Sequence, residues 1–259
     1  MSLNASLREL FEPSTHTDAR HRLQVSLAAG RGEIRESQRL RHQVFVEEMG
    51  ARIDCTEAGI EADRFDPYCQ HLIVRDLNAD RVVGSYRLLE DRDAVRAGGF
   101  YSQTEFELGR ILALPGRVME VGRTCVHPDY RSGATIALLW QGLARYLVIN
   151  KIDYLMGCAS IPLKGGTDEA LAIYRRLADR HLAPAEWRVY PRNPLPRVNL
   201  AGVQPDVAVP PLVKGYLRVG AKICGEPAWD PQFNVADLFI MLHADSISAR
   251  YSRHFIHHS

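Results

Sequence analysis

The sequence predicts a single α/β domain, and three observations support this. The chain has 259 residues, 46% of them hydrophobic, so it is long and apolar enough to bury one substantial core. Segments that alternate in hydrophobicity like strands are interleaved with segments of helical periodicity. Their order, β-α-β-β-α-β-α-β-α-β-β, is typical of one α/β domain rather than of separate all-α and all-β units.

The first part of the chain is expected to give an arm, a strand and a helix. Residues 1–22 show little periodicity and are predicted to form a flexible N-terminal arm, which leaves 23–255 as the domain. Residues 23–27 alternate like a strand. Apolar residues at helical spacing predict a helix over 33–49, and Gly50 is typical of a helix end.

The next segments are expected to form a hairpin and a further strand. Two strands, 71–75 and 81–89, flank the turn residues 78–80. A short helix is predicted at 104–108, and a strand is predicted over 118–126.

The last part is expected to contain two helices and the remaining strands. Residues 134–149 are apolar nearly all round, which predicts a buried helix. Residues 184–212 contain seven prolines and predict a long Pro-rich loop within the domain. The other predicted elements are a strand at 154–159, an amphipathic helix at 169–182, and two late strands at 212–223 and 235–242.

Composition argues against several functional classes. The chain carries 32 Lys and Arg against 31 Asp and Glu, a net charge of +1, which is not the basic excess of a nucleic-acid-binding protein. Its five cysteines are widely spaced without a CxxC pair, so we expect no metal site and reduced thiols in a cytoplasmic protein. The longest apolar run is broken by Gln141 and Arg145 and is too short to span a bilayer, so any membrane contact would be peripheral.

The most informative stretch is 120–131, which predicts a strand that ends in the turn His127-Pro128-Asp129. A turn of small residues, 132–134, then opens the buried helix. Backbone N–H groups at a helix start lack intrahelical partners and can bind an anion or a carbonyl oxygen. Taken alone, the stretch fits a ligand-binding turn and an ordinary structural turn equally well.

This layout resembles the acyl-donor site of the GNAT superfamily of acyltransferases. The resemblance implies a mixed central sheet with splayed strands 4 and 5 and helices on both faces. It also implies that main-chain groups hold the pantetheine arm of the donor, at Cys125, Val126, Arg131, Ser132, Gly133 and Ala134. The superfamily turn, Gln/Arg-x-x-Gly-x-Gly/Ala, is only partly kept, because Ala134 and Ile136 occupy the positions of the small pair. We therefore expect a donor without the coenzyme A pyrophosphate, namely a pantetheine arm on an acyl carrier protein.

Further motifs resemble the L-ornithine Nα-acyltransferases of bacterial ornithine-lipid synthesis, some of them labelled haemolysins, and the related acyl-homoserine-lactone synthases. The motifs lie at 41–45, 65–72, 83–89, 99–102, 157–160, 212–218, 224–230 and 233–237, so the resemblance covers roughly 23–255. It implies transfer of a (3-hydroxy)fatty acyl group from acyl carrier protein to the α-amino group of L-ornithine, with acyl-phosphopantetheine as co-substrate and no other cofactor. The alternatives are a lactone-type synthase, an enzyme for glycine, lysine or glutamine, and a non-enzymatic acyl-binding or lytic protein.

Glu120 is the candidate catalytic base, with Arg123 as a second catalytic residue. An ammonium has no lone pair, so the acceptor must lose a proton before it attacks a thioester, and a positioned carboxylate accelerates that step. A charged residue in the middle of a strand is costly unless it is paired or functional. The competing interpretation is a buried structural ion pair between Glu120 and Arg123.

The resemblance also gives candidate residues for the acceptor. Asp63 and Asp66 would hold its second ammonium, whereas Arg41 and Arg87 would hold its carboxylate or order the acidic loop, since guanidinium groups suit carboxylates. The full set of acceptor residues is Arg41, Phe45, Asp63, Asp66, Arg87 and Phe106.

A basic segment is the expected docking surface. Between 174 and 222 there are nine Arg and Lys against three Asp and Glu. Such a patch would attract an acidic acyl carrier protein, with Arg175, Arg176 and Arg180 as the contact residues. Anionic lipid at the inner membrane face is the rival partner, and a solvated basic face is the third interpretation.

Overall fold

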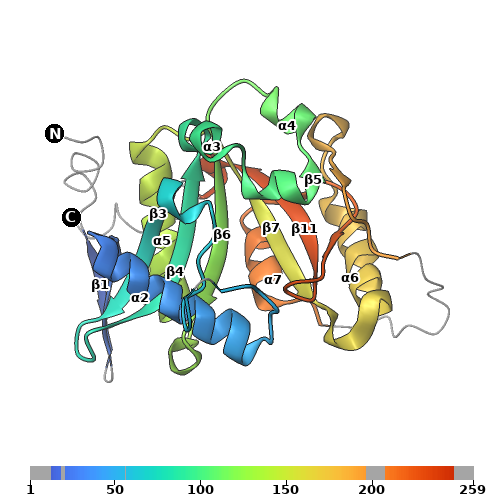
Figure 1. Ribbon diagram of the computed structural model, residues 1–259. Coiled ribbons are helices and arrows are strands. Elements are labelled where there is room, and N and C mark those ends of the chain that lie inside the picture. Colours follow the sequence, from blue (N-terminus) through green and yellow to red (C-terminus); the bar gives the residue numbers. More distant parts are fainter. Residues whose placement is uncertain (1–12, 19–20, 56, 197–207, 248–259) are drawn as a thin grey trace.

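A computed structural model describes residues 13–18, 21–55, 57–196 and 208–247 of the chain (Figure 1). At its centre lies a nine-stranded sheet of order β1-β2-β3-β4-β6-β7-β11-β10, in which β9 also pairs with β11. The strands are β1 Ser14–Thr17, β2 Arg22–Leu27, β3 Gln70–Asp76, β4 Arg81–Glu90, β6 Val118–Val126, β7 Tyr154–Pro162, β9 Lys222–Ile223, β10 Ala228–Asp230 and β11 Val235–His243. Neighbouring strands are antiparallel except β6 and β7, so the prediction of a mixed sheet is confirmed.

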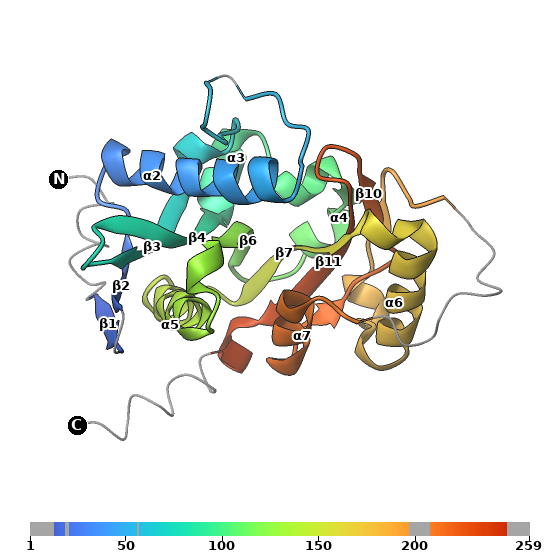
Figure 2. The same cartoon turned by 90° about the horizontal axis from the view of Figure 1, so that it is seen from below.

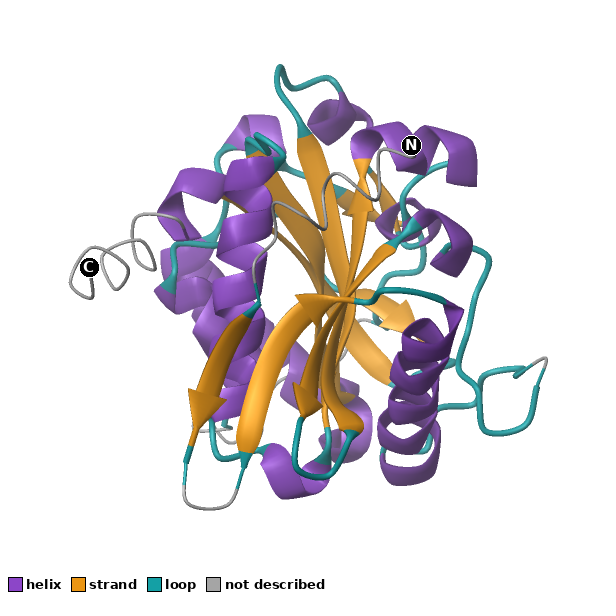
Figure 3. Cartoon of the chain, turned by 90° about the vertical axis from the view of Figure 1, so that its left-hand side faces the viewer, coloured by secondary structure: helices purple, strands orange, loops and turns teal. Residues whose placement is uncertain are grey.

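Helices cover both faces of this sheet, as predicted (Figures 2 and 3). The α-helices are α2 Arg31–Arg41, α3 Asp91–Ala97, α4 Gly109–Leu112, α5 Ala134–Ile149, α6 Gly166–His181 and α7 Pro211–Arg218, and α2 continues as a π-helix, η1, over His42–Glu48. Alternation along β3 divides the core: Ile73 packs with α2 on one face, while Leu72 and Val74 pack with α5 on the other. The prediction that α5 is buried is confirmed, because nine of its sixteen residues are buried.

The sheet opens between β6 and β7. These parallel strands pair only over 118–120 and 154–156, after which β6 stays with β4 and β7 stays with β11. Gly157 lies at the point of separation, where a Cβ atom would stand 2.3 Å from the carbonyl oxygen of Val121. The splay that was predicted between strands 4 and 5 is therefore present between β6 and β7. Because Gly157 has no side chain, the backbones of β6 and β7 can approach each other closely at the point where they separate.

Two predicted elements are wrong. The helix expected at 104–108 is instead a 3-10 turn, η3 Tyr101–Thr104, followed by strand β5, Phe106–Glu107. Strand β5 pairs with β8, Tyr190–Pro191, a partner far away in sequence that local periodicity does not reveal. The strand expected at 212–223 is mostly helix α7, because proline at the first helical position favours a helix start there.

The predicted arm and the Pro-rich loop contain short elements. Strand β1 lies within the arm and pairs with β2, whereas 1–12 and 19–20 lie outside the described residues. The Pro-rich segment includes a 3-10 turn, η6 Ala185–Trp187, and β8, and its residues 197–207 are not described. Within the described ranges, no helix is both long enough and apolar enough to cross a bilayer.

Candidate active site

A cavity of about 880 Å³ occupies the opening between β6 and β7. Its wall includes residues of both splayed strands, the end of η1, the first turn of α5 and helix α7. The polar residues that line the cavity include Glu120, Arg123, Cys158, Ser160, Asp230 and Asp237. Strands that separate thus create a pocket in the middle of the sheet, where polar groups are shielded from water.

Glu120 lies on the wall of this cavity and is the last residue of β6 that pairs with β7. Its side chain is buried and accepts hydrogen bonds from the backbone N–H groups of Tyr101 and Ser102, each at 2.7 Å, and from the Ser102 hydroxyl. Burial raises the pKa of Glu120, and the hydrogen bonds from η3 oppose that shift. The carboxylate is therefore fixed in position and more basic than an exposed glutamate.

Arg123 reaches the same cavity from a bulge in β6. The register between β4 and β6 shifts between Ser85 and Arg87, and Arg123 takes a left-handed φ of 52°. Its guanidinium pairs with Glu61 at 3.0 Å and with Asp63 at 3.2 Å. Arg123 therefore forms its ion pairs with the loop that precedes β3, and not with Glu120 as the competing interpretation expects.

Arg123 belongs to a buried ionic network of three arginines and three acids, which are Arg41, Arg87, Arg123, Glu61, Asp63 and Asp66. Arg41 is fully buried, donates to both Asp66 oxygens at 2.6 and 2.9 Å, and also binds Glu61. Arg87 contacts Asp63 at 2.6 Å. These contacts order the acidic loop, which is one of the two roles expected for Arg41 and Arg87. They also engage both aspartates that were expected to hold an acceptor ammonium.

The predicted donor residues lie where β6 meets α5. Gly133 precedes the helix with a left-handed φ of 105°, and no side chain caps the first turn of α5. Arg131 is held by Glu48 through two hydrogen bonds of 2.6 Å and also donates to the carbonyl oxygen of Val126 at 3.1 Å. Cys125 is buried, which raises its pKa to about 12 and makes it a poor nucleophile. Of the six predicted donor residues, the cavity wall includes Cys125, Val126, Arg131 and Gly133 but neither Ser132 nor Ala134.

The remaining predicted residues fall in different places. Phe45 lines the cavity, whereas Phe106 is a core residue that packs against Phe239 with ring centres 5.6 Å apart. Arg175 and Arg180 are exposed on α6, and Arg176 beside them is half-buried.

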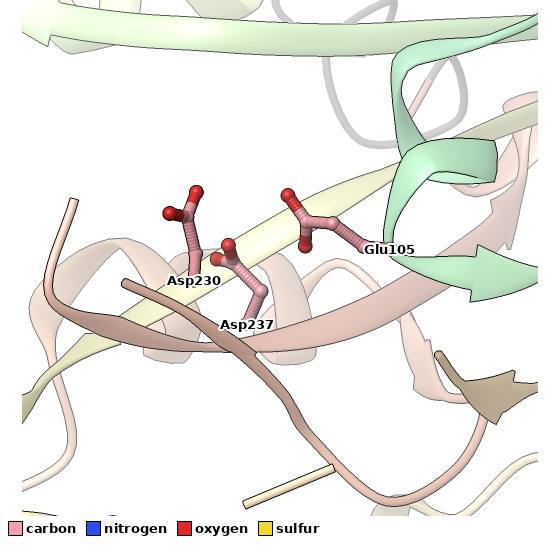
Figure 4. A group of neighbouring side chains, drawn as sticks. All are labelled: Glu105, Asp230 and Asp237. Carbon is pink, nitrogen blue, oxygen red and sulfur yellow. The ribbon is translucent and has the colours of Figure 1, made fainter. Parts of the chain in front are cut away.

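Sequence reasoning missed one group of side chains, a cluster of three carboxylates formed by Glu105, Asp230 and Asp237 (Figure 4). One oxygen from each lies within 4.8 Å of the others. Asp237 is the third residue of β11, and all the remaining residues of this strand except His243 are apolar. A charge in an apolar strand is the signal that selects Glu120, and it could have identified Asp237 as well. Glu105 follows η3 and gives no such signal, because only its tertiary position brings it to the cluster.

A sheet opened beside an uncapped helix start is the arrangement expected of GNAT acyltransferases, and residues 40–141 match the acetyltransferase (GNAT) domain family. Among solved structures, FeeM, an N-acyl amino acid synthase from uncultured soil microbes, shares the fold with a TM-score of 0.55 and 14% identity over 89% of this chain and 95% of that one. The acyl-homoserine-lactone synthase LasI does so with a TM-score of 0.51 and 12% identity over 89% and 91%. The fold and the family match define an acyltransferase.

Proteins of similar sequence show which family of acyltransferases this chain belongs to. The L-ornithine N(α)-acyltransferase of Brucella abortus is 38% identical over 248 residues, which is 90% of this chain and 88% of that protein. The one from Rhodobacter capsulatus is 39% identical over 247 residues, which is 88% of this chain and 92% of that protein. This chain belongs to the L-ornithine N(α)-acyltransferase family.

Proposed function

We propose that this protein transfers a (3-hydroxy)fatty acyl group from the pantetheine thioester of an acyl carrier protein to the α-amino group of L-ornithine. The observation that carries the proposal is the position of Glu120, a buried carboxylate on the wall of the cavity between the splayed strands. The full-length relatives named L-ornithine N(α)-acyltransferase supply the acceptor.

The cavity has the two regions that such a reaction needs. Residues 121–126 of β6 have no strand partner on the β7 side, so their main-chain groups can bind the pantetheine arm and polarise the thioester carbonyl. Apolar residues, including Ile136, Trp140 and Leu212, line the part of the cavity next to α5 and α7 and would hold the acyl chain.

Glu120 would accept a proton from the acceptor ammonium, directly or through a water molecule. The free amine then attacks the thioester carbon and forms the C–N bond. The C–S bond breaks, the nitrogen gives up one further proton as the amide forms, and the pantetheine sulfur takes up a proton and leaves as a thiol. Arg123 would act by holding the acidic loop and the Tyr101 ring, over which its guanidinium lies at 4.7 Å.

A carrier-borne donor fits this site better than free coenzyme A. Arg131, the residue at the first position of the superfamily turn, is engaged by Glu48. A carboxylate at this place would repel a pyrophosphate, while a pantetheine arm carries no charge there. Exposed arginines on α6, Arg175 and Arg180, are the proposed docking contacts for the acidic carrier.

The test is acyl transfer by the purified protein from 3-hydroxyacyl carrier protein to L-ornithine, followed by mass spectrometry. Replacement Glu120→Gln should lower kcat by about 10²–10⁴-fold, because it removes the base. The amide nitrogen of Gln cannot accept one of the two backbone N–H bonds, so circular dichroism is used to verify that the variant is folded. Glu107→Gln, which removes an exposed carboxylate on β5, is the matched control.

Other outcomes identify the alternatives. Full activity of the Glu120→Gln variant would refute the proposed base. A lactone product formed with S-adenosylmethionine, and no product with ornithine, would identify a lactone-type synthase instead. Binding of the acyl carrier protein without transfer to any amino acid would identify an acyl-binding protein.

A further inference from the structure

The carboxylate cluster of Glu105, Asp230 and Asp237 adjoins Glu120. Tyr101 connects the two, since its backbone N–H donates to Glu120 at 2.7 Å and its hydroxyl donates to Asp230 at 3.3 Å. Asp230 and Asp237 line the same cavity as Glu120. A molecule that presents one group to Glu120 can therefore reach the cluster with another.

The cluster is rigidly held, and no cationic side chain of the described residues forms an ion pair with it. Asp237 accepts a 2.6 Å hydrogen bond from Ser160, and Asp230 accepts backbone N–H bonds from Gln232 and Phe233. Both aspartates are more than nine-tenths buried, with 3% and 7% of their surface exposed. Within the described residues, no lysine or arginine forms an ion pair with any of the three carboxylates.

Glu105 supplies an independent sign of a missing partner. One of its carboxylate oxygens, Oε1, is buried and has no hydrogen-bond partner in the described part of the chain. Burial, followed by the charge of Asp237, raises the pKa of Glu105 to about 9. Burial also raises the pKa of Asp237 to about 6, against the hydrogen bond from Ser160. The direction of these shifts means that the nearby positive charge, which comes from Arg123, does not offset the burial of the acids.

We propose that Glu105, Asp230 and Asp237 bind the side-chain ammonium of the acceptor, so that this enzyme selects a diamino acid over amino acids without a second cation. This assignment rests on the proposed N-acyltransferase function. An alkylammonium offers three N–H donors, which matches three carboxylates that converge on one point. Asp63 and Asp66 are already paired with arginines, so they leave this role to the cluster.

The decisive comparison uses L-ornithine and L-norvaline, which share a carbon skeleton and differ in the terminal amino group. Acylation of both is measured for the full-length wild-type protein and for Asp237→Asn and Glu105→Gln. The ornithine-to-norvaline ratio of kcat/KM should fall by about ten- to a hundred-fold in Asp237→Asn, chiefly through KM for ornithine, because a charge-assisted hydrogen bond is lost. Glu107→Gln, an exposed acid two residues from Glu105, should leave the ratio unchanged.

Calorimetric binding of the two amino acids without donor separates this assignment from the proposed function. Wild-type protein that binds ornithine more tightly than norvaline, with the difference abolished by Asp237→Asn, supports the cluster even if no acyl transfer occurs. An unchanged ratio, or an equal fall for both amino acids, would overturn it. So would activity that is lost in EDTA and restored by Mg²⁺, Ca²⁺ or Mn²⁺, since a metal ion would then occupy the three carboxylates.

Discussion

Replacement of Arg41 by methionine tests whether the buried ionic network orders the site or binds the acceptor carboxylate. Methionine keeps much of the side-chain volume and removes the charge. The Arg41 guanidinium is fully buried and makes four hydrogen bonds, two to Asp66 and two to Glu61, one of which is to the Glu61 main-chain oxygen at 2.8 Å. Its loss would leave two carboxylates buried next to an apolar group.

The expected cost follows from that geometry. Removal of one member of a buried ion pair destabilises a protein by about 3–5 kcal/mol, since the remaining charge stays desolvated. For a chain of this size each kcal/mol lowers Tm by about 2–4 °C, so the variant should melt about 6–20 °C below wild type. A second change, Asp66→Asn, should restore part of the loss in the Arg41→Met background. The exposed pair of Arg35 and Glu57 is the control, and Arg35→Met should cost under about 1 kcal/mol.

Acidification provides a second measurement on the same network. Burial acts to raise the pKa of Asp66, but the hydrogen bonds and charge of Arg41 outweigh it and hold the pKa well below its usual range. A lowered pKa contributes stability above about pH 4, the unfolded value, and this stability is lost as the pH falls further. Wild type should show that loss, and Arg41→Met should show less of it. A variant with unchanged Tm and a raised KM for ornithine would refute the structural role and assign Arg41 to the acceptor carboxylate.

Three further predictions address the opening, the acidic cluster and the docking surface. Gly157→Ala should lower the free energy of unfolding by about 1–3 kcal/mol, measured by urea titration, because its Cβ would overlap a β6 carbonyl oxygen at 2.3 Å. The ligand-free protein should lose stability as pH rises from about 4 to 9, because folding raises the pKa of Asp237 and of Glu105 and the unfolded chain releases those protons at lower pH. In the Asp237→Asn variant, Tm measured from melting curves should depend less steeply on pH. Charge reversal at Arg175 and Arg176 together should raise KM for acyl carrier protein several-fold at low salt and leave KM for ornithine unchanged; equal KM values would rule out docking there.

The fold was largely predictable because its main elements are locally encoded. Period-two alternation in 23–27, the short apolar run within 71–75 and the nearly uniform apolar character of 134–149 correspond to β2, β3 and α5. The two errors, at 104–108 and 212–223, fall where a distant strand or an initial proline determines the structure. Local patterns cannot report a pairing partner some eighty residues away.

Prediction of the site was uneven for a related reason. Glu120 could be selected because a charge in an apolar strand is unusual whatever its partners are. The partners themselves cannot be read from the sequence. The competing interpretation pairs Glu120 with Arg123, whereas the ion pairs of Arg123 are with Glu61 and Asp63. The resemblance implies that Phe106 contacts the acceptor, whereas in the structure its side chain is buried in the core and packs against Phe239.

The two acidic groups beside the cavity differ in their charge balance. One is the network that contains Glu61, Asp63 and Asp66, and the other is the cluster of Glu105, Asp230 and Asp237. In the ionic network, three acids pair with three arginines, so this group needs no ligand to be stable when buried. In the other group, the described residues supply hydroxyl and main-chain donors and the Cys158 thiol, which fix the orientation of the acids without neutralising them. A buried site that is held in place and left short of positive charge stabilises a protein less than a fully paired one. Its acids keep protons to a higher pH, as the raised pKa values of Glu105 and Asp237 indicate, and a bound cation would offset the remaining cost. That difference in charge balance is the reason why the second group, and not the first, is the proposed binding site for the side-chain ammonium of the acceptor.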